Sequence, residues 1–297
     1  MSPRVGRFPA ARVVVVGDVA VDVLVRPSRP AVPGADVPAR IRTTAGGAGA
    51  NTAAWLAHLG ADVTLVARVG DDAAGRAAAD ELRAAGVRPV LAVDPHHPTC
   101  TVVALLGDGD RTLLSDRGAA AHLQPADLPD LDGAHHLHLS GYVLLDPSSR
   151  DAGRYALAAA RAAGISTSVD PQAAPALTPA FREWVHGVDL LLPNADELHA
   201  LGGAVGLLDD VAAVAATCAG HGATWHDAHG GWATGTPAVE VVDATGAGDA
   251  FDAGLLVAWL RGAGPEDALR AGCAAAAQAV GRSGARPPRP RAPGRSE

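Results

Sequence analysis

The segment Asp-Ala-Thr-Gly-Ala-Gly-Asp-Ala-Phe, residues 243–251, constrains the fold more than any other stretch of this chain. A β-branched apolar run at 239–242 precedes it, and an apolar segment typical of a helix follows at 250–260. The segment is therefore expected to turn the chain from a strand into a helix. Gly246 and Gly248 permit a tight turn and allow a ligand to approach the backbone closely.

The first turn of the expected helix combines an anion site with a carboxylate. The N–H groups of Ala247, Gly248 and Asp249 would lie unpaired at the positive end of the helix dipole, which favours an anion. A carboxylate beside such a site suits a base that takes a proton from a hydroxyl attacking a phosphoryl group. The simpler alternative is a helix N-terminus with glycine for the turn and Asp249 for the dipole.

Apolar strands alternate with helical segments along the chain, which predicts a mostly parallel sheet with helices on both faces. Two amphipathic strand pairs, at 19–43 and 99–115, do not fit this layer and are expected to form a small separate sheet. The other expected strands are at 12–17, 62–67, 89–93, 135–139, 165–169 and 188–192, with a strand pair before residue 243. Helices are expected up to His58 and at 73–85, 151–163, 178–185, 195–201, 208–219, 250–260 and 265–280.

The composition narrows the classes of function. With 297 residues, 48% hydrophobic content and a net charge of −8, the chain suits one large α/β domain and not a general nucleic-acid binder. No stretch suits a signal peptide or a membrane span, and the three separated cysteines match no zinc or redox spacing, so a cytoplasmic protein is expected. All 24 basic residues are arginine, which excludes Walker A loops, protein kinases and Schiff-base enzymes, because each needs a lysine.

A second glycine-rich segment, Gly-Gly-Ala-Gly-Ala-Asn, occupies residues 46–51. Gly46 and Gly47 would let a polyhydroxyl ligand lie against bare backbone, and Asn51 offers a donor and an acceptor to hydroxyls. The spacing differs from the dinucleotide-binding fingerprint, and a glycine-rich helix start remains the simpler alternative. Of the histidines His135, His136 and His138, the last two share one face of the expected strand. No third metal ligand follows at a recognisable spacing, so these histidines are expected to be structural.

Together, the two glycine-rich segments resemble the N-terminal and C-terminal signatures of the ribokinase-like (pfkB) family of carbohydrate and nucleoside kinases. The resemblance covers residues 12–288 and implies a three-layer α/β/α core with a mostly parallel sheet and a small β-sheet lid over the sugar. We expect one kinase domain over residues 1–285, with the lid strands at 19–43 and 99–115, and a disordered Pro- and Arg-rich tail over 286–297.

The resemblance also implies roles for individual residues. Asp249 would be the catalytic base, and the loop formed by Gly246, Ala247 and Gly248 would bind the transferring phosphoryl group. The sugar would be held by Asp22, Gly46, Gly47 and Asn51, with Asp18 as a weaker candidate.

The Pro-Asn-Ala-Asp-Glu segment at 193–197 resembles a family motif in which Asn194 and Glu197 would orient magnesium-bound water and the phosphates. A capped helix start is the alternative. Asp243 and Thr245 match positions that line a monovalent-cation site in relatives, which would take K⁺.

Two regions depart from the family. In the segment 225–231, which relatives use to bind nucleotide, His226 stands for a lysine and Ala228 for a glycine, while Gly231 remains. Cys273 replaces an asparagine that often borders adenine. These changes predict a weakened nucleotide site.

The prediction is an ATP- and Mg²⁺-dependent kinase that phosphorylates a hydroxyl of a small sugar, of the ribokinase, fructokinase or ketodeoxygluconate kinase kind. A nucleoside kinase of the same fold and a sugar-binding homologue without turnover are the alternatives. The resemblance also suggests a homodimer through the lid, with no nucleic-acid or membrane partner.

Overall fold

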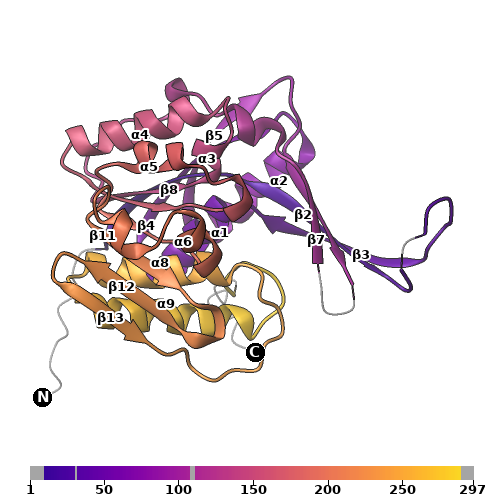
Figure 1. The fold of residues 1–297 in the computed structure, drawn as a ribbon. Helices are drawn as coiled ribbons and strands as arrows, with labels where there is room; N and C mark the ends of the chain where they lie inside the picture. Colours follow the sequence, from indigo (N-terminus) through magenta and orange to yellow (C-terminus); the bar gives the residue numbers. More distant parts are fainter. Residues whose placement is uncertain (1–9, 31, 108–110, 289–297) are drawn as a thin grey trace, which may run out of the picture.

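The computed structural model describes residues 10–30, 32–107 and 111–288, which form two sheets and their covering helices (Figure 1). All neighbours from β11 to β5 in the larger sheet are parallel, and β12 and β13 add an antiparallel edge. The nine strands lie in the order β13 (Gly230–Thr234), β12 (Ala223–Asp227), β11 (Ala213–Thr217), β10 (Leu190–Leu191), β9 (Ser166–Asp170), β8 (His136–Ser140), β1 (Arg12–Val16), β4 (Asp62–Gly70) and β5 (Val87–Asp94).

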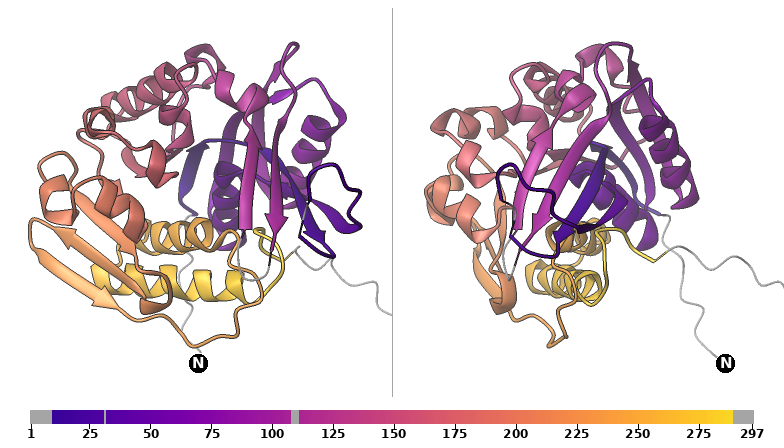
Figure 2. Two further views of the ribbon diagram at one scale, coloured as in Figure 1. Left: turned by 45° about the vertical axis from the view of Figure 1, so that its right-hand side comes forward. Right: turned by 90° about the vertical axis from the view of Figure 1, so that its right-hand side faces the viewer.

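The smaller, four-stranded sheet is the expected lid, and it projects from the core on the side away from β12 and β13 (Figures 1 and 2). Its order is β3 (Ala39–Gly46), β2 (Ala20–Pro27), β6 (Cys100–Leu106) and β7 (Arg111–Asp116). The two expected strand pairs are antiparallel, and parallel pairing of β2 with β6 joins them into one sheet. The α/β fold with a separate lid is thus confirmed.

Strand β1 shows how the layers form. Its alternate residues Val13 and Val15 face one core, while Val14 and Val16 face another, because side chains alternate across a strand. The first core packs against α1 (Ala48–His58), α2 (Ala73–Ala84), α8 (Ala247–Leu260) and α9 (Pro265–Val280). The second packs against α3 (Tyr142–Leu145), α4 (Arg150–Ala162), α5 (Pro179–Val185), α6 (Ala195–Ala200) and α7 (Ala204–Leu207).

Two predicted elements are wrong. The segment 208–219 is not a helix, because it contains β11, which pairs with β10 on one side and β12 on the other. Its alanines favour a helix locally, but burial between two strands overrides that propensity. The run at 239–242 is not a strand; Val241 is 66% exposed and Val242 59% exposed.

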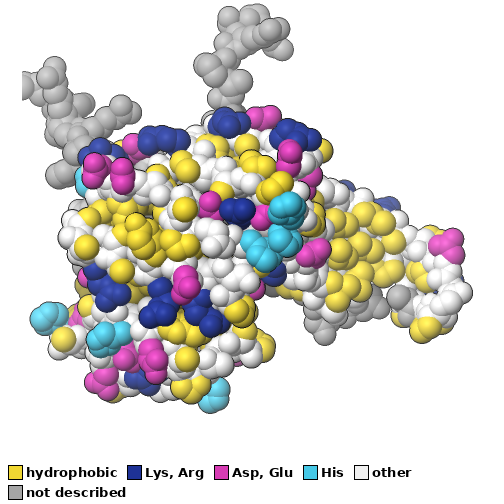
Figure 3. All heavy atoms as spheres, turned by 90° about the horizontal axis from the view of Figure 1, so that it is seen from above, with side chains coloured by type: hydrophobic (Ala, Val, Ile, Leu, Met, Phe, Trp, Pro, Cys, Tyr) yellow, Lys and Arg dark blue, Asp and Glu magenta, His cyan; other side chains and the backbone are white. Residues whose placement is uncertain are grey.

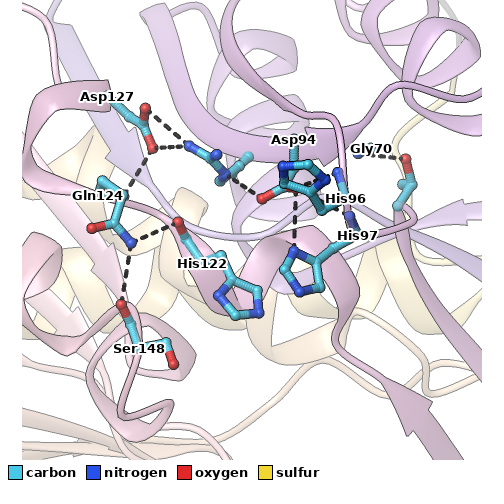
Figure 4. Close-up of polar contacts among 10 residues, drawn as sticks. Gly70, Asp94, His96, His97, His122, Gln124, Asp127 and Ser148 are labelled. Carbon is cyan, nitrogen blue, oxygen red and sulfur yellow. Dashed lines mark hydrogen bonds and ion pairs between the residues drawn. The ribbon is translucent and has the colours of Figure 1, made fainter.

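A polar network holds the chain where it leaves β5 for the lid (Figure 4). Arg68 of β4 donates to Asp94 Oδ2 at 2.9 Å and to Asp127 Oδ2 at 3.0 Å, and the ring of His97 stacks on that of His122 at 3.9 Å. Burial by itself would raise the pKa of Asp94. Hydrogen bonds from the backbone N–H groups of His96 and His97 and from the Arg68 side chain outweigh burial and hold that pKa well below its usual range. The network therefore anchors the base of the lid.

Candidate active site

The carboxylate of Asp249 meets the amide of Asn51 although nearly two hundred positions separate them. Asp249 lies in the first turn of α8 and Asn51 in α1, and Asn51 Nδ2 donates to Asp249 Oδ2 at 2.9 Å. Burial raises the pKa of Asp249 to about 7, against the opposing effect of this hydrogen bond. A carboxylate with such a pKa can accept a proton near neutral pH, as a general base must.

The glycine-rich segment 46–51 is fixed by the buried carboxylate of Asp18. Asp18 Oδ1 accepts the Gly49 N–H at 3.0 Å, and its Oδ2 accepts Arg117 Nη1 at 2.9 Å. Gly47 has a φ of +90°, and a Cβ there would come within 2.7 Å of the Asp18 carbonyl oxygen. Only glycine therefore fits, and both Asp18 oxygens already have partners within the protein.

Asp22 lies on β2 opposite Thr44, with its carboxylate against Gly46. A side chain at Gly46 would collide with this carboxylate. Burial, and then the negative charge of Asp18, raise the pKa of Asp22 to about 6. The structure thus brings Asp22, Gly46, Asn51 and Asp249 into one region, and their roles in binding and catalysis stay predictions.

Arg286 also belongs to this region, although the sequence placed it at the start of the disordered tail. Its Nε donates to Asn51 Oδ1 at 2.8 Å and its Nη2 to the Gly46 carbonyl oxygen at 3.2 Å. Arg286 is therefore held in place by the protein, and residues 289–297 of the predicted tail lie outside the described residues.

The loop before α8 requires glycine at its end. Gly246 has a φ of +75°, and a Cβ there would come within 2.6 Å of the Ala285 side chain. Asp243 ties this loop to the C-terminal segment, because its carboxylate accepts the N–H groups of Thr245 at 2.9 Å and Gly284 at 3.0 Å. A cation at Asp243 and Thr245 stays a prediction.

One part of the expected anion site is wrong. The N–H of Ala247 is not unpaired, because it donates to the Ala244 carbonyl oxygen at 3.3 Å. Gly248 and Asp249 follow it in the first turn of α8, where N–H groups point along the helix axis toward the N-terminus. An anion at this helix start would therefore depend on the amides of Gly248 and Asp249.

A polar cavity of about 240 Å³ lies in front of this loop. Asn194 and Glu197 line it, and they form a reciprocal cap at the start of α6, with Glu197 Oε2 accepting the Asn194 N–H at 2.9 Å. The capped helix and the candidate phosphate site are therefore the same structure. The lining residues are Asp170, Gln172, Leu192, Asn194, Glu197, Thr217, Ala244, Gly246, Ala247, Gly248, Asp249 and Asp252.

Two carboxylates of this cavity, Asp170 and Asp252, were missed by the sequence analysis. Burial, and then the charge of neighbouring carboxylates, raise the pKa of both well above the ordinary value, and Asp252 Oδ2 has no hydrogen-bond partner among the described residues. Asp170 ends β9 at the carboxyl edge of the sheet, a position that could have identified it.

The chemistry of the residues that line the cavity fits a magnesium ion. Buried carboxylates with little compensating charge favour a cation, and burial likewise raises the pKa of Glu197. In the described part of the chain, no three His, Cys, Asp or Glu side chains are placed to hold a metal directly. Magnesium often takes only one or two carboxylates and completes its shell with water and phosphate oxygens.

The structure does not bring His226, Gly231 and Cys273 to this cavity. His226 and Gly231 are paired across β12 and β13, and Cys273 is buried in α9 within the core. His226 Nδ1 is buried without a partner among the residues that the structure describes. The roles of these three residues in binding nucleotide stay predictions.

The histidines of β8 are structural, as expected. His136 and His138 are buried, and both rings contact the Ser168 hydroxyl, at 2.7 and 2.8 Å. Burial lowers their pKa values, to about 3 for His136 and about 4 for His138, so both rings are neutral at physiological pH.

The chain is similar to a known protein family and to several of its members. The model of the pfkB family of carbohydrate kinases matches residues 10–292. An ATP-dependent ribose-1-phosphate kinase from Halopiger xanaduensis is 33% identical, with 93% of this chain and 94% of the relative covered.

Solved structures show the same fold. Adenosine kinase from Sinorhizobium meliloti has a TM-score of 0.83 at 25% identity, with 93% of this chain and 96% of that chain covered. A protein described as ribokinase II from E. coli, in complex with ATP and Mg²⁺, has a TM-score of 0.82 at 25% identity, with 93% and 94% covered.

Within the described residues, no helix has the length and hydrophobicity to cross a bilayer.

Proposed function

Because this chain belongs to the pfkB family of carbohydrate kinases and is therefore a phosphotransferase, we propose that it transfers the terminal phosphoryl group of ATP to a hydroxyl of a small sugar. One observation supports this function above the others. Asp249 lies between the glycine-rich segment 46–51 and the polar cavity. It accepts a hydrogen bond from Asn51 of that segment, and it also lines the cavity. A base between an acceptor and a donor site is what phosphoryl transfer to a hydroxyl requires.

On the acceptor side, the sugar lies against Gly46 and Gly47 under the lid. Asp22 and Asn51 bind its hydroxyls, and Asp249 takes the proton from the hydroxyl that attacks phosphorus. The raised pKa of Asp249 supports this role, since a base is most effective when its pKa lies near the working pH.

On the donor side, the phosphates of ATP lie in the polar cavity. The amides of Gly248 and Asp249 stabilise the negative charge of the transferring phosphoryl group. Asn194 and Glu197 would hold magnesium through water, and the bound ion would supply positive charge against the phosphates. The solved E. coli relative is in complex with both ATP and Mg²⁺, which supports the same cofactors here.

An ADP-release assay with a panel of acceptors tests this function. The panel comprises ribose, ribose-1-phosphate, fructose, a ketodeoxygluconate and adenosine, each with ATP and MgCl₂. Turnover of a sugar or sugar phosphate is the expected result, and preference for adenosine would establish the nucleoside kinase instead. Sugar binding by calorimetry without any ADP release would favour the non-catalytic homologue.

Asp22→Ala and Asn51→Ala are each expected to weaken acceptor binding. Hydrogen bonds to charged groups contribute roughly 1.5–3 kcal/mol, so loss of Asp22 should raise Kd for the acceptor about tenfold or more. Calorimetry with the acceptor and, separately, with ATP measures this. Unchanged acceptor affinity in both variants would place the sugar elsewhere, and unchanged ATP affinity is the control.

We also propose that the lid mediates a homodimer. Seen from above, hydrophobic side chains gather on the projecting lid (Figure 3). Four lid residues, Ile41, Leu105, Leu113 and Leu114, are between 36% and 64% exposed. In sedimentation experiments, wild type should be a dimer, and Ile41→Asp should be a monomer because the new charge would lie in the interface. A monomeric wild type would contradict the proposal.

A further inference from the structure

The C-terminal segment after α9 returns to the site and is held there by specific contacts. Trp55 Nε1 of α1 donates to the Ala285 carbonyl oxygen at 2.9 Å, and the Ala285 side chain fills the space that a side chain at Gly246 would need. The next residue, Arg286, therefore has a fixed position between the two glycine-rich segments.

Arg286 determines which way the Asn51 amide points. A guanidinium only donates hydrogen bonds, so the atom that it contacts must be the amide oxygen, Asn51 Oδ1. The amide nitrogen is then directed at Asp249 Oδ2, where it donates to the carboxylate. When Asp249 is ionised, its carboxylate favours the same orientation, because the opposite one would set two oxygens against each other. When Asp249 is protonated it could donate to the amide oxygen instead, and Arg286 is then the contact that keeps the amide nitrogen directed at Asp249.

We propose that Arg286 is a positioning residue for the catalytic base: it locks the Asn51 amide in the orientation that donates to Asp249, and it sets a permanent positive charge opposite that carboxylate. This inference rests on the proposed function, since it takes Asp249 as the base. The chain has no lysine, so an arginine is the only side chain with a permanent positive charge available for this position.

The charges around Asp249 show why one cation matters here. Asp18, which follows β1, and Asp22 on β2 face it from the acceptor side, and Asp170 of β9 and Asp252 of α8 face it from the cavity. The charge of Asp249 raises the pKa of Asp170 and of Asp252. Burial, Asp18 and Asp22 favour protonation of Asp249, whereas the hydrogen bond from Asn51 and the charge of Arg286 oppose it. Removing Arg286 should therefore raise the pKa of the base.

The test compares Arg286→Gln, Arg286→Lys and wild type, with Arg282→Gln as the matched control. Arg282 lies four residues earlier and is exposed, so its substitution makes the same charge change outside the site. In Arg286→Gln, the acid limb of the profile of kcat/KM against pH should move to higher pH by about one unit. At pH values below the midpoint of that limb, kcat/KM should then be about tenfold lower than in wild type. At higher pH, kcat/KM should return to the wild-type value. Arg286→Lys should return the limb toward wild type, because it restores the charge.

A uniform loss of kcat/KM at all pH values in Arg286→Gln, or an unchanged profile, would overturn the proposal. A purely structural role would give the first of these results.

A second measurement does not depend on turnover. The difference in Tm between a chain with Asp249 and the same chain with Asp249→Asn reports the titration of Asp249. Folding raises the pKa of Asp249 from 3.8 in the unfolded chain to about 7. The contribution of Asp249 to the free energy of unfolding therefore falls as pH rises from 3.8 to about 7. In the Arg286→Gln background this window should extend to higher pH. An unchanged window would refute the inference about Arg286, whereas absence of kinase activity in wild type would refute only the proposed function.

Discussion

Replacing Asp249 by asparagine is expected to lower kcat by on the order of 10²–10⁴-fold, because the variant has no group to accept the proton of the attacking hydroxyl. Asparagine keeps the size of the side chain and can still accept the hydrogen bond from Asn51. The acceptor should therefore bind with nearly unchanged Kd. The ADP-release assay and calorimetry on the same preparation separate these two quantities.

The same variant should be more stable than wild type. Because burial raises the pKa of Asp249 to about 7, this side chain lowers the stability of the folded protein progressively as pH rises from the unfolded pKa of 3.8 to about 7, and the full cost remains at higher pH. Asparagine removes this cost, and each kcal/mol recovered should raise Tm by about 2–4 °C for a protein of this size class. A variant with near-normal kcat would remove Asp249 from the mechanism, and a lower Tm would show that the loss of activity reflects misfolding.

Replacing Arg117 by glutamine is expected to destabilise the fold by about 3–5 kcal/mol, because it removes the cation from a buried charge network. Arg117 donates to Asp18 at 2.9 Å and to Asp146 at 3.0 Å, and its guanidinium lies over the ring of Tyr142 at 4.4 Å. Burial disfavours this charge, but the attraction of several neighbours, Asp18 first and Asp146 among the others, together outweighs burial and raises the pKa of Arg117. Urea unfolding of both proteins measures the difference.

Arg76→Gln is the control for this substitution. Arg76 pairs with Asp71 at 3.1 Å, and both side chains are at least 67% exposed. An exposed pair contributes only about 0–1 kcal/mol, so the control should unfold close to wild type. If the two variants lost equally little stability, the buried network around Asp18 would not support the glycine-rich segment as inferred.

The sequence predicted the core elements well where apolar pattern and turn residues agree. The valines of β1 and the glycine-bounded start of α1 gave both element types correctly. The prediction was wrong at β11, whose Ala-Val-Ala-Ala sequence is also compatible with a helix. Only pairing with β10 and β12 decides that it is a strand, and those partners are not local.

The residues of the candidate site also differ in whether a local sequence pattern could identify them. Asp249 and Asn51 could be identified because each lies in a glycine-rich segment with a recognisable spacing, and Asp22 because the family resemblance implies a sugar-binding residue at that position. Arg286 and Arg117 could not, because neither has a local pattern that distinguishes it from the many other arginines. Asp252 follows Asp249 by one turn of α8, yet the sequence does not show that its carboxylate is buried.

By itself, the sequence determined the family resemblance, the α/β class with its lid, and the identity of the expected base, because these depend on short-range patterns of glycine, apolar and acidic residues. The tertiary structure alone decided how segments distant in the chain meet. It placed Arg286 beside Asn51, and it gathered Asp170, Glu197 and Asp252 around one cavity. Those contacts set the burial and the charge around Asp249, and a pKa depends on surroundings that no local pattern encodes.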